Sequence, residues 1–375
     1  MRILLATGVF FPDVGGPAIH VRKIAERFSA EGLQPLVLCY GDDQAGADFP
    51  FEVIRISRKS NKILQWAFYL WRALVLARRV DLIYAFDPTA AGLPARFAAK
   101  FFNKPFVIRV GGDPIWERQA ELGKVFMPLV DYYNQGLYKK DKPLLYRLIK
   151  FVLAGADAIV LYSQSFKDFY IKYFAVDPNR VRIIKNPVSR KESALPALPA
   201  SPVILFAGRF VKYKNLVLVF KAFKSLDVVA GQPRLLLIGK GPEQVALMSL
   251  AQELGIQDSI QFMGSIPQIE LFDQIRKSAI CIGPALSEFN PNFILEALSL
   301  GKPVLLSRGH GLSVDLPEEF LFDPLSQGSL EAKLSYLLIP ENYRRAVKTV
   351  DTLEMNQTWE KVTDFHSALI REVIR

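Results

Sequence analysis

Residues 287–304 read SEFNPNFILEALSLGKPV, and this stretch predicts a loop, a helix and a strand in succession. Asn290 and Pro291 are typical of a helix start, because an Asn side chain can cap free N–H groups and Pro at the first helical position loses no hydrogen bond. Gly301 is typical of the end of that helix, and the apolar residues after it predict a short buried strand. This order of elements is the repeating unit of an α/β protein.

The same alternation of strands and helices runs through the rest of the chain. In the first half, apolar strands alternate with helical segments that include residues 17–31 and 63–79, and a second series runs from residue 203 to residue 307. Such alternation is typical of a parallel sheet covered by helices on both faces. Residues 189–202, rich in Ser, Ala and Pro, separate the two series and predict a linker.

A chain of 375 residues is long for one core and fits two domains. We predict an α/β protein with two doubly wound, Rossmann-like domains facing a central cleft, one over residues 1–190 and the other over residues 200–355. A closing helix over residues 356–375 is expected to pack back on the first domain. Since ligands of such sheets bind outside the carboxyl ends of the strands, we expect the site in the cleft.

Composition narrows the class of protein. The only cysteines, Cys39 and Cys281, lie in apolar runs, so we expect neither a disulfide framework nor a thiolate metal site. We expect no export signal, because the sequence starts with a strand and a Gly-rich turn, and no membrane-spanning helix. These features favour a cytoplasmic protein.

Candidate ligand-binding residues follow the predicted strands. Gly15 and Gly16 follow the first strand and open a helix, so that backbone N–H groups can approach an anion closely. In the second series, Arg209 ends a strand and Lys214 comes five residues later. Two cations at such a point suit a diphosphate, because Arg can bond two oxygens at once and Lys acts as a point charge.

The two acids of the opening stretch fit the same kind of ligand. Glu296, one turn inside its helix, is suited to a ribose hydroxyl, and Glu288, in the loop before it, to a sugar hydroxyl near the reacting carbon. The helix that follows also offers its positive end to phosphates. A nucleotide sugar needs all of these contacts.

The second half resembles the donor-binding domain of the retaining GT-B glycosyltransferases of family 4. The family motifs are a G-R-x4-K loop, a G-x-G-P turn and E-x7-E, and all three occur here in that order. The resemblance extends over essentially the whole chain, including FFPDVGGPAIHV near the start and Trp359 in the closing helix. It implies a GT-B fold and transfer of a sugar from a nucleoside diphosphate, with retention at the anomeric carbon, to a glycan or lipid-linked acceptor in cell-envelope or polysaccharide biosynthesis.

Site residues carry over from the family motifs. The resemblance assigns catalysis to Glu288 and Asp113; donor binding to Arg209, Lys214, Gly239, Gly241, Glu288, Asn292 and Glu296; and the acceptor-side loop to Gly15, Gly16 and His20. Asp113 takes the place of a histidine that many members carry, and Phe289-Asn290-Pro291-Asn292 stands where many members carry glycines after the first glutamate. The cations would stabilise the leaving diphosphate, so we expect neither a metal nor another cofactor. The adjacent acids Asp42 and Asp43 fit a solvated turn.

Three other classes compete with a transferase. A nicotinamide-dependent oxidoreductase also has nucleotide-binding domains, but the first turn lacks the G-x-G-x-x-G spacing. A nucleotide-sugar epimerase of similar architecture would have no reason for a strongly basic half. A catalytically silent GT-B scaffold remains open because FNPN replaces the usual glycines.

The charge of the chain is concentrated in its first half. Residues 1–200 hold 29 Lys and Arg against 18 Asp and Glu, whereas residues 201–375 hold 18 against 19. The densest basic patch, residues 138–150, reads YKKDKPLLYRLIK and predicts attachment to an anionic membrane surface at the cytoplasmic face. The segment 63–79 is nearly all apolar, and it predicts a buried helix rather than a helix that lies on a membrane. No nucleic-acid-binding fold accompanies the charge, so nucleic acid is not expected as a partner.

Overall fold

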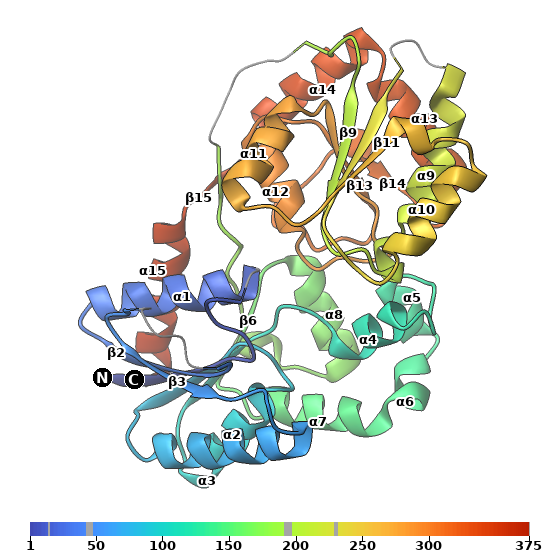
Figure 1. Ribbon diagram of the computed structural model, residues 1–375. Coiled ribbons are helices and arrows are strands. Elements are labelled where there is room, and N and C mark those ends of the chain that lie inside the picture. Colours follow the sequence, from blue (N-terminus) through green and yellow to red (C-terminus); the bar gives the residue numbers. More distant parts are fainter. Residues whose placement is uncertain (14–15, 43–47, 191–196, 229–231, 375) are drawn as a thin grey trace. The chain divides into compact units, whose positions relative to one another are not determined.

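The computed structural model describes residues 1–13, 16–42, 48–190, 197–228 and 232–374, which form two compact units (Figure 1). Unit 1 comprises Met1–Ile115, Gly136–Pro187 and Gln357–Arg375, and unit 2 comprises Trp116–Gln135 and Val188–Asn356. Residues 191–196 of the expected linker lie outside the described residues. Residues 116–135 thus belong to unit 2 although they lie in the first half of the sequence, and they are called the inserted segment below.

Unit 1 is built on a seven-stranded sheet with the order β3-β2-β1-β4-β5-β6-β7. Its strands are β1 (Arg2–Ala6), β2 (Gln34–Tyr40), β3 (Glu52–Ile56), β4 (Leu82–Ala85), β5 (Phe106–Arg109), β6 (Ala158–Leu161) and β7 (Val181–Ile183). Every neighbouring pair is parallel, and in the middle Leu4 pairs with Leu36 on one side and Ile83 on the other. Strand β4 is buried throughout and β1 is buried from Ile3 onward, because helices cover both faces of the sheet.

Helices cover both faces of this sheet. They are α1 (Gly16–Ala30), α2 (Lys62–Ala77), α3 (Gly92–Phe101), α6 (Leu137–Asp141), α7 (Pro143–Ala154), α8 (Gln164–Phe174) and α15 (Trp359–Ile374), with the 3-10 helix η1 (Pro178–Arg180). In Figure 1, α1 and α15 lie on one face, and α2 and α3 on the other. The closing helix α15 is tied to α1 by a bond of 2.6 Å between Arg27 and Asp364.

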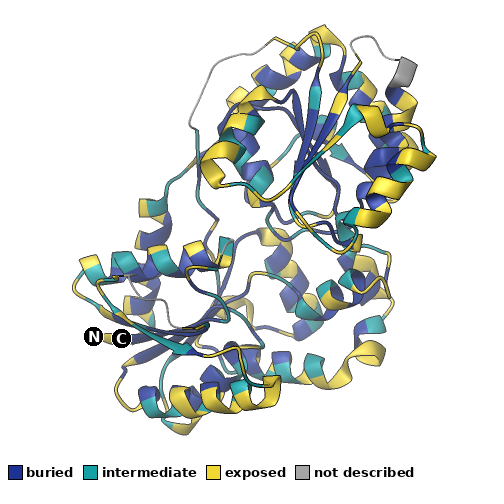
Figure 2. Ribbon diagram, viewed as in Figure 1, coloured by how far each residue is buried: buried dark blue, intermediate teal, exposed yellow. Residues whose placement is uncertain are grey.

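The prediction that the helix around residues 63–79 is buried is wrong. Helix α2 buries one stripe of side chains, Tyr69, Ala73, Leu76 and Ala77, and leaves large apolar side chains exposed on the other side. Apolar residues around a whole helix predict burial only where neighbours surround it, and α2 lies in the outer layer of unit 1 (Figure 2).

Unit 2 repeats the architecture with a six-stranded sheet of order β11-β10-β9-β12-β13-β14. Its strands are β9 (Val203–Ala207), β10 (Arg234–Ile238), β11 (Ile260–Met263), β12 (Ile280–Gly283), β13 (Val304–Ser307) and β14 (Leu321–Phe322), all paired in parallel. Two-residue strands β8 (Val188–Ser189) and β15 (Asn356–Gln357) stand outside the two large sheets. Two doubly wound, Rossmann-like units therefore confirm the predicted fold class.

The helices of unit 2 complete its layers. They are α9 (Leu216–Lys224), α10 (Gln244–Glu253), α11 (Gln268–Lys277), α12 (Asn292–Ser299), α13 (Gln327–Leu337) and α14 (Pro340–Thr352), with η2 (Lys212–Lys214), η3 (Ser225–Val228), η4 (Gln257–Ser259) and η5 (Glu318–Phe320). Two helices lie in the inserted segment: α4 (Pro114–Glu121), which starts at the end of unit 1, and α5 (Leu129–Asn134). Throughout the described ranges, each helix is too short or too polar to cross a bilayer.

The start of α12 differs from the prediction. The helix begins at Asn292, Pro291 is its N-cap, and no side chain caps it. Asn290 does not cap the helix because its Oδ1 accepts a bond of 3.3 Å from the backbone N–H of Ser313. The predicted end is confirmed, since Gly301 follows the helix with a φ of 72°.

Candidate active site

The predicted donor-binding residues gather at the carboxyl ends of β9, β10 and β12 in unit 2. Strand order reverses at β9, which has β10 on one side and β12 on the other. Such a switch point leaves a crevice at the carboxyl ends, because the loops on its two sides diverge. Arg209 follows β9, and Glu288 follows β12.

Lys214 and Glu288 form an ion pair across this switch point. The ammonium of Lys214 donates to Oε1 of Glu288, and only 13% and 22% of the two side chains are exposed. Backbone bonds fix both partners: the N–H of Leu286 donates to the carbonyl of Tyr213 at 2.8 Å, and that of Gly311 to the carbonyl of Glu288 at 2.9 Å. Backbone bonds of the two loops therefore hold the charges of Lys214 and Glu288 in fixed positions.

Arg209 makes a different kind of pair. Its guanidinium bonds to Oε1 of Glu121 at 2.5 Å, and 67% of the Arg209 side chain is exposed. Glu121 comes from the inserted segment, which is attached to unit 2 by a buried bond of 2.9 Å from the backbone N–H of Leu129 to Ser287. The ring of Trp116 also packs edge-on against Tyr213 at 5.6 Å.

Neither Glu121 nor Tyr213 was predicted as part of the site. Glu121 lies far from the donor motifs in the sequence, and no spacing pattern connects it to Arg209. Tyr213 lies between the motif positions and carries a phenol whose pKa burial raises, with the nearby carboxylates adding to the shift. A signal for Tyr213 existed in its position beside Lys214, whereas none existed for Glu121.

Gly239 and Gly241 allow two loop backbones to meet. A Cβ atom on Gly239 would lie 2.0 Å from the carbonyl oxygen of Gly208, and one on Gly241 would lie 2.2 Å from that of Phe210. The loops are joined by bonds of 3.1 Å from the N–H of Phe210 to Lys240 and from Glu243 to Phe210. These glycines thus position the loop that carries Arg209, whatever they contact in a ligand.

Helix α12 brings the remaining predicted donor residues. Glu296 is half-buried and accepts a bond of 2.6 Å from Gln268, and Asn292 is exposed at the first position of the helix. Next to the Glu288 loop, burial lowers the pKa of His310 to about 4, so its ring is neutral and its Nδ1 accepts the N–H of Leu312.

The predicted acceptor-side residues and Asp113 belong to unit 1. Gly15 lies outside the described residues, and Gly16 is the first residue of α1. His20 is buried against the ring of Trp359 at 4.8 Å, and burial holds its pKa well below the usual range. Asp113 is fully buried just before α4.

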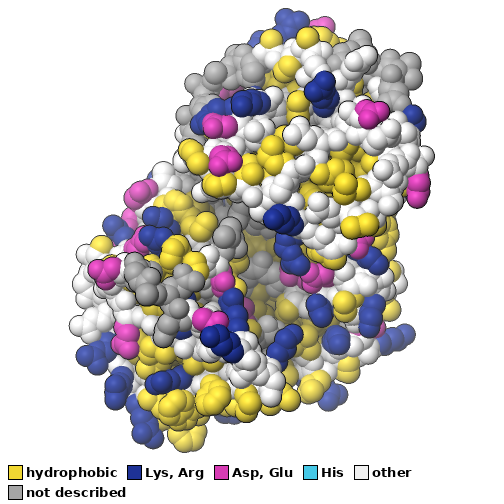
Figure 3. Space-filling view, in the orientation of Figure 1, with side chains coloured by type: hydrophobic (Ala, Val, Ile, Leu, Met, Phe, Trp, Pro, Cys, Tyr) yellow, Lys and Arg dark blue, Asp and Glu magenta, His cyan; other side chains and the backbone are white. Residues whose placement is uncertain are grey.

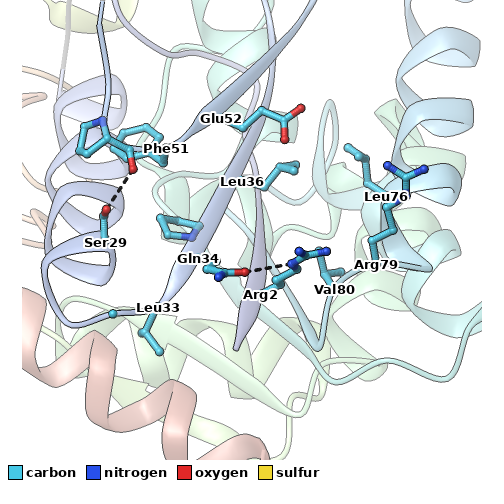
Figure 4. A pocket seen from close by; sticks show the side chains of 13 residues that line it. Arg2, Ser29, Leu33, Gln34, Leu36, Phe51, Glu52, Leu76, Arg79 and Val80 are labelled. Carbon is cyan, nitrogen blue, oxygen red and sulfur yellow. Dashed lines mark hydrogen bonds between the residues drawn. The ribbon is translucent and has the colours of Figure 1, made fainter.

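Two further features bear on other kinds of site. A pocket of about 650 Å³ opens at the amino ends of β1, β2 and β3, where Arg2 bonds to Gln34 at 2.9 Å (Figure 4). It contains none of the predicted site residues and lies at the opposite end of these strands from their switch point. Among the described residues, no cluster of three or more His, Cys, Asp or Glu side chains is arranged to hold a metal. Asp42 accepts a bond from Ser57 at 2.6 Å, and Asp43 lies outside the described residues.

Two Rossmann-like units, with two cations at the switch point of one of them, fit the GT-B class of glycosyltransferases. The family described as glycosyl transferases group 1 matches residues 190–349, and the one described as glycosyltransferase family 4 matches residues 14–192. The chain therefore belongs to family 4 of the glycosyltransferases.

Known proteins agree with this assignment. An alpha-monoglucosyldiacylglycerol synthase of Streptococcus pneumoniae is 24% identical over 88% of this chain and 76% of its own. The fold matches a sucrose-phosphate synthase of Thermosynechococcus elongatus with a TM-score of 0.77 and 20% identity, over 99% of this chain and 98% of that one. HepE of Anabaena, solved in complex with UDP, matches with a TM-score of 0.73 and 15% identity, over 99% of this chain and 100% of its own.

Proposed function

We propose that the protein transfers a sugar from a nucleoside-diphosphate donor to a glycan or lipid-linked acceptor, with retention at the anomeric carbon. The observation that carries the proposal is the fixed ion pair of Lys214 and Glu288, with Arg209 following the neighbouring strand, at the switch point of unit 2. Cations held there by the backbone suit an anionic ligand, and the carboxylate suits its neighbouring hydroxyls.

In this proposal Arg209 and Lys214 bind the donor diphosphate. The bond between the anomeric carbon and the diphosphate breaks, a bond to the acceptor oxygen forms, and the acceptor hydroxyl gives up its proton. Negative charge grows on the diphosphate as it leaves, and preorganised cations stabilise that charge more in the transition state than in the ground state. The two side chains would take the role that a metal ion has elsewhere, so activity is expected to survive EDTA.

Two carboxylates on the β12 side would hold the rest of the donor. We assign Glu288 to the transferred sugar, because Lys214 orients its carboxylate, and Glu296 to the ribose. Asn292, exposed at the start of α12, would meet the sugar or its phosphate. On the acceptor side we assign Gly15, Gly16 and His20 to positioning and Asp113 to the acceptor hydroxyl.

The relatives support a nucleotide donor and a lipid-linked acceptor. HepE is described in complex with UDP, and the name of the Streptococcus pneumoniae relative refers to a diacylglycerol lipid. Together with the excess of cations in the first half, these names support a protein that works at the cytoplasmic face of an anionic membrane.

A ligand screen tests the donor assignment without knowledge of the acceptor. Thermal unfolding is measured with a series of nucleoside diphosphates and the matching nucleosides, because a ligand stabilises the fold in proportion to its affinity. We expect a diphosphate to raise the melting temperature and Arg209→Gln to reduce that rise, while nucleoside binding changes little. Equal losses for diphosphate and nucleoside would contradict a phosphate contact.

Product formation separates the transferase from its alternatives. Incubation with a labelled nucleotide sugar and a lipid extract should release nucleoside diphosphate and a labelled lipid or glycan, with and without EDTA. Conversion of the donor sugar to its epimer would favour an epimerase, and tight binding with no turnover would favour a silent scaffold. Loss of activity in EDTA with rescue by Mg²⁺ or Mn²⁺ would overturn the metal-independent account.

A further inference from the structure

Helix α2 exposes an apolar ridge to solvent. Ile63 is 80% exposed, Phe68 52% and Trp71 53%, although each is large and apolar. Leu64, Phe68 and Trp71 are spaced four and three residues apart, so they lie along one stripe of the helix. Burying such a stripe in an apolar phase would be strongly favourable, and the described residues of unit 1 leave it uncovered.

Helix α3 extends this apolar surface. It packs side by side with α2 and adds Phe101, which is 74% exposed, and Phe97, which is 38% exposed. Figure 3 shows apolar side chains gathered along this edge of unit 1, with Lys and Arg side chains around them. The α2–α3 face is defined here by Ile63, Leu64, Phe68, Trp71, Phe97 and Phe101 together with the cations Lys62, Arg72 and Lys100.

The charged side chains that helices α2 and α3 contribute are all basic. Residues 53–80 contain seven Lys and Arg and no Asp or Glu. Within the described residues, Lys62, Arg72 and Lys100 make no ion pair, and the guanidinium of Arg72 lies 4.8 Å from the ring of Trp71. Long basic side chains that flank aromatic rings can lay their stems on an apolar phase and keep their charges at its polar boundary.

We propose that the α2–α3 face docks reversibly on an anionic lipid bilayer, with α2 lying in the plane of the interface. The aromatic and aliphatic side chains would enter the boundary between headgroups and acyl chains, and the cations would meet lipid phosphates. A bilayer satisfies both halves of the face at once, whereas a second copy of the chain would bring cations against cations.

This inference deepens the proposed function, because it names the surface through which a transferase would reach a lipid-linked acceptor. It also moves the main contact away from the segment 138–150, where Tyr138 is buried and Leu144 is the large apolar side chain most clearly exposed. Helix α7 packs on α3, so the exposed lysines of that segment would add charge beside the face rather than form its apolar centre.

The test measures binding of the whole protein to vesicles of phosphatidylcholine alone or mixed with phosphatidylglycerol, across a salt series. We expect binding only with the anionic lipid, and weaker binding as salt rises. Lys62→Gln with Arg72→Gln should lower the partition coefficient about 25-fold, because each cation near the surface contributes roughly 5-fold. Phe68→Gln with Trp71→Gln should lower it at least about 10-fold.

Matched controls come from exposed residues of unit 2. Lys221→Gln with Lys277→Gln removes the same charge, and Val245→Gln with Ile269→Gln removes exposed apolar side chains, so neither pair should weaken binding. Tryptophan emission should move to shorter wavelength on vesicles, and Trp71→Phe should reduce that shift.

Several results would overturn the proposal. They are equal binding to neutral and anionic vesicles, equal losses in the unit 2 controls, no binding at all, or a dimer in solution that the α2 substitutions dissolve, which would assign the face to a second copy. Nucleoside diphosphate binding, followed by thermal shift without lipid, should stay unchanged in the α2 variants. Failure of membrane docking is therefore distinguishable from failure of the donor site.

Discussion

The pair of Arg209 and Glu121 leads to a counterintuitive prediction, namely that removing an acid near the site strengthens donor binding. In the described structure Glu121 bonds to the guanidinium that we assign to the donor diphosphate. A diphosphate has to displace this carboxylate before it can bond to Arg209. Glu121→Gln removes the competing charge and keeps a side chain of nearly the same shape, so Arg209 is released at little structural cost.

The size of the effect follows from exposure. Since 67% of the Arg209 side chain and 25% of that of Glu121 are exposed, solvent screens the pair. Exposed ion pairs contribute about 0.2–1 kcal/mol. The dissociation constant for a nucleoside diphosphate should therefore fall by up to about 5-fold in Glu121→Gln. The gain should shrink as salt is added.

The assay is calorimetric titration of the wild-type protein and Glu121→Gln with the best nucleoside diphosphate and its nucleoside. Asp131→Asn is the matched control, because Asp131 is an exposed acid of the same inserted segment. The diphosphate should bind more tightly only to the Glu121 variant, and the nucleoside should bind equally to all three proteins. Unchanged or weaker diphosphate binding in Glu121→Gln would refute the idea that Glu121 competes with the ligand.

Three further predictions concern turnover, packing and pH. Glu288→Gln should lower the rate of transfer at least about 100-fold while the protein stays folded, and a normal rate would remove its assignment to the sugar. Gly241→Ala should destabilise the protein by about 1–3 kcal/mol, because its Cβ would meet the backbone oxygen of Phe210 at 2.2 Å, whereas Gly328→Ala, with open space around it, should not. Burial lowers the pKa of His310 from 6.5 to about 4, so folding favours its neutral ring. The contribution of His310 to the free energy of unfolding should be fully present above pH 6.5 and be lost as the pH drops toward 4. His310→Gln should make that fall shallower in melts recorded across this range.

Sequence reasoning succeeded where local chemistry decides structure. The apolar runs at 203–207 and 234–238 predict strands that end before Gly208 and Gly239, and the structure has strands there. Arg209 and Glu288 were predicted at strand ends, and parallel strands bring such ends to one edge of a sheet. Strands β7 and β14, with three and two residues, carry too short a pattern to be recognised.

Sequence reasoning failed where contacts between residues far apart in the sequence decide the local structure. Asn290 has the side chain of a helix cap, but the loop at Ser313 takes up its oxygen. Segment 63–79 has the composition of a buried helix, but which neighbours cover it is a property of the assembled layers. The docking of Glu121 on unit 2 depends on buried contacts such as that of Leu129 with Ser287, which lie 158 positions apart.

The way in which the two units share the chain has a consequence for protein synthesis. Unit 1 needs Gln357–Arg375, and unit 2 needs Trp116–Gln135, which leaves the ribosome before the rest of that unit. The nascent chain therefore holds α1 without α15 until the last turns are translated, and holds the inserted segment without its partners for over fifty residues of elongation, from residue 135 to residue 188. Neither unit can be completed as a continuous stretch, so expression of residues 1–187 or 188–356 alone should yield chains that aggregate or require a chaperone.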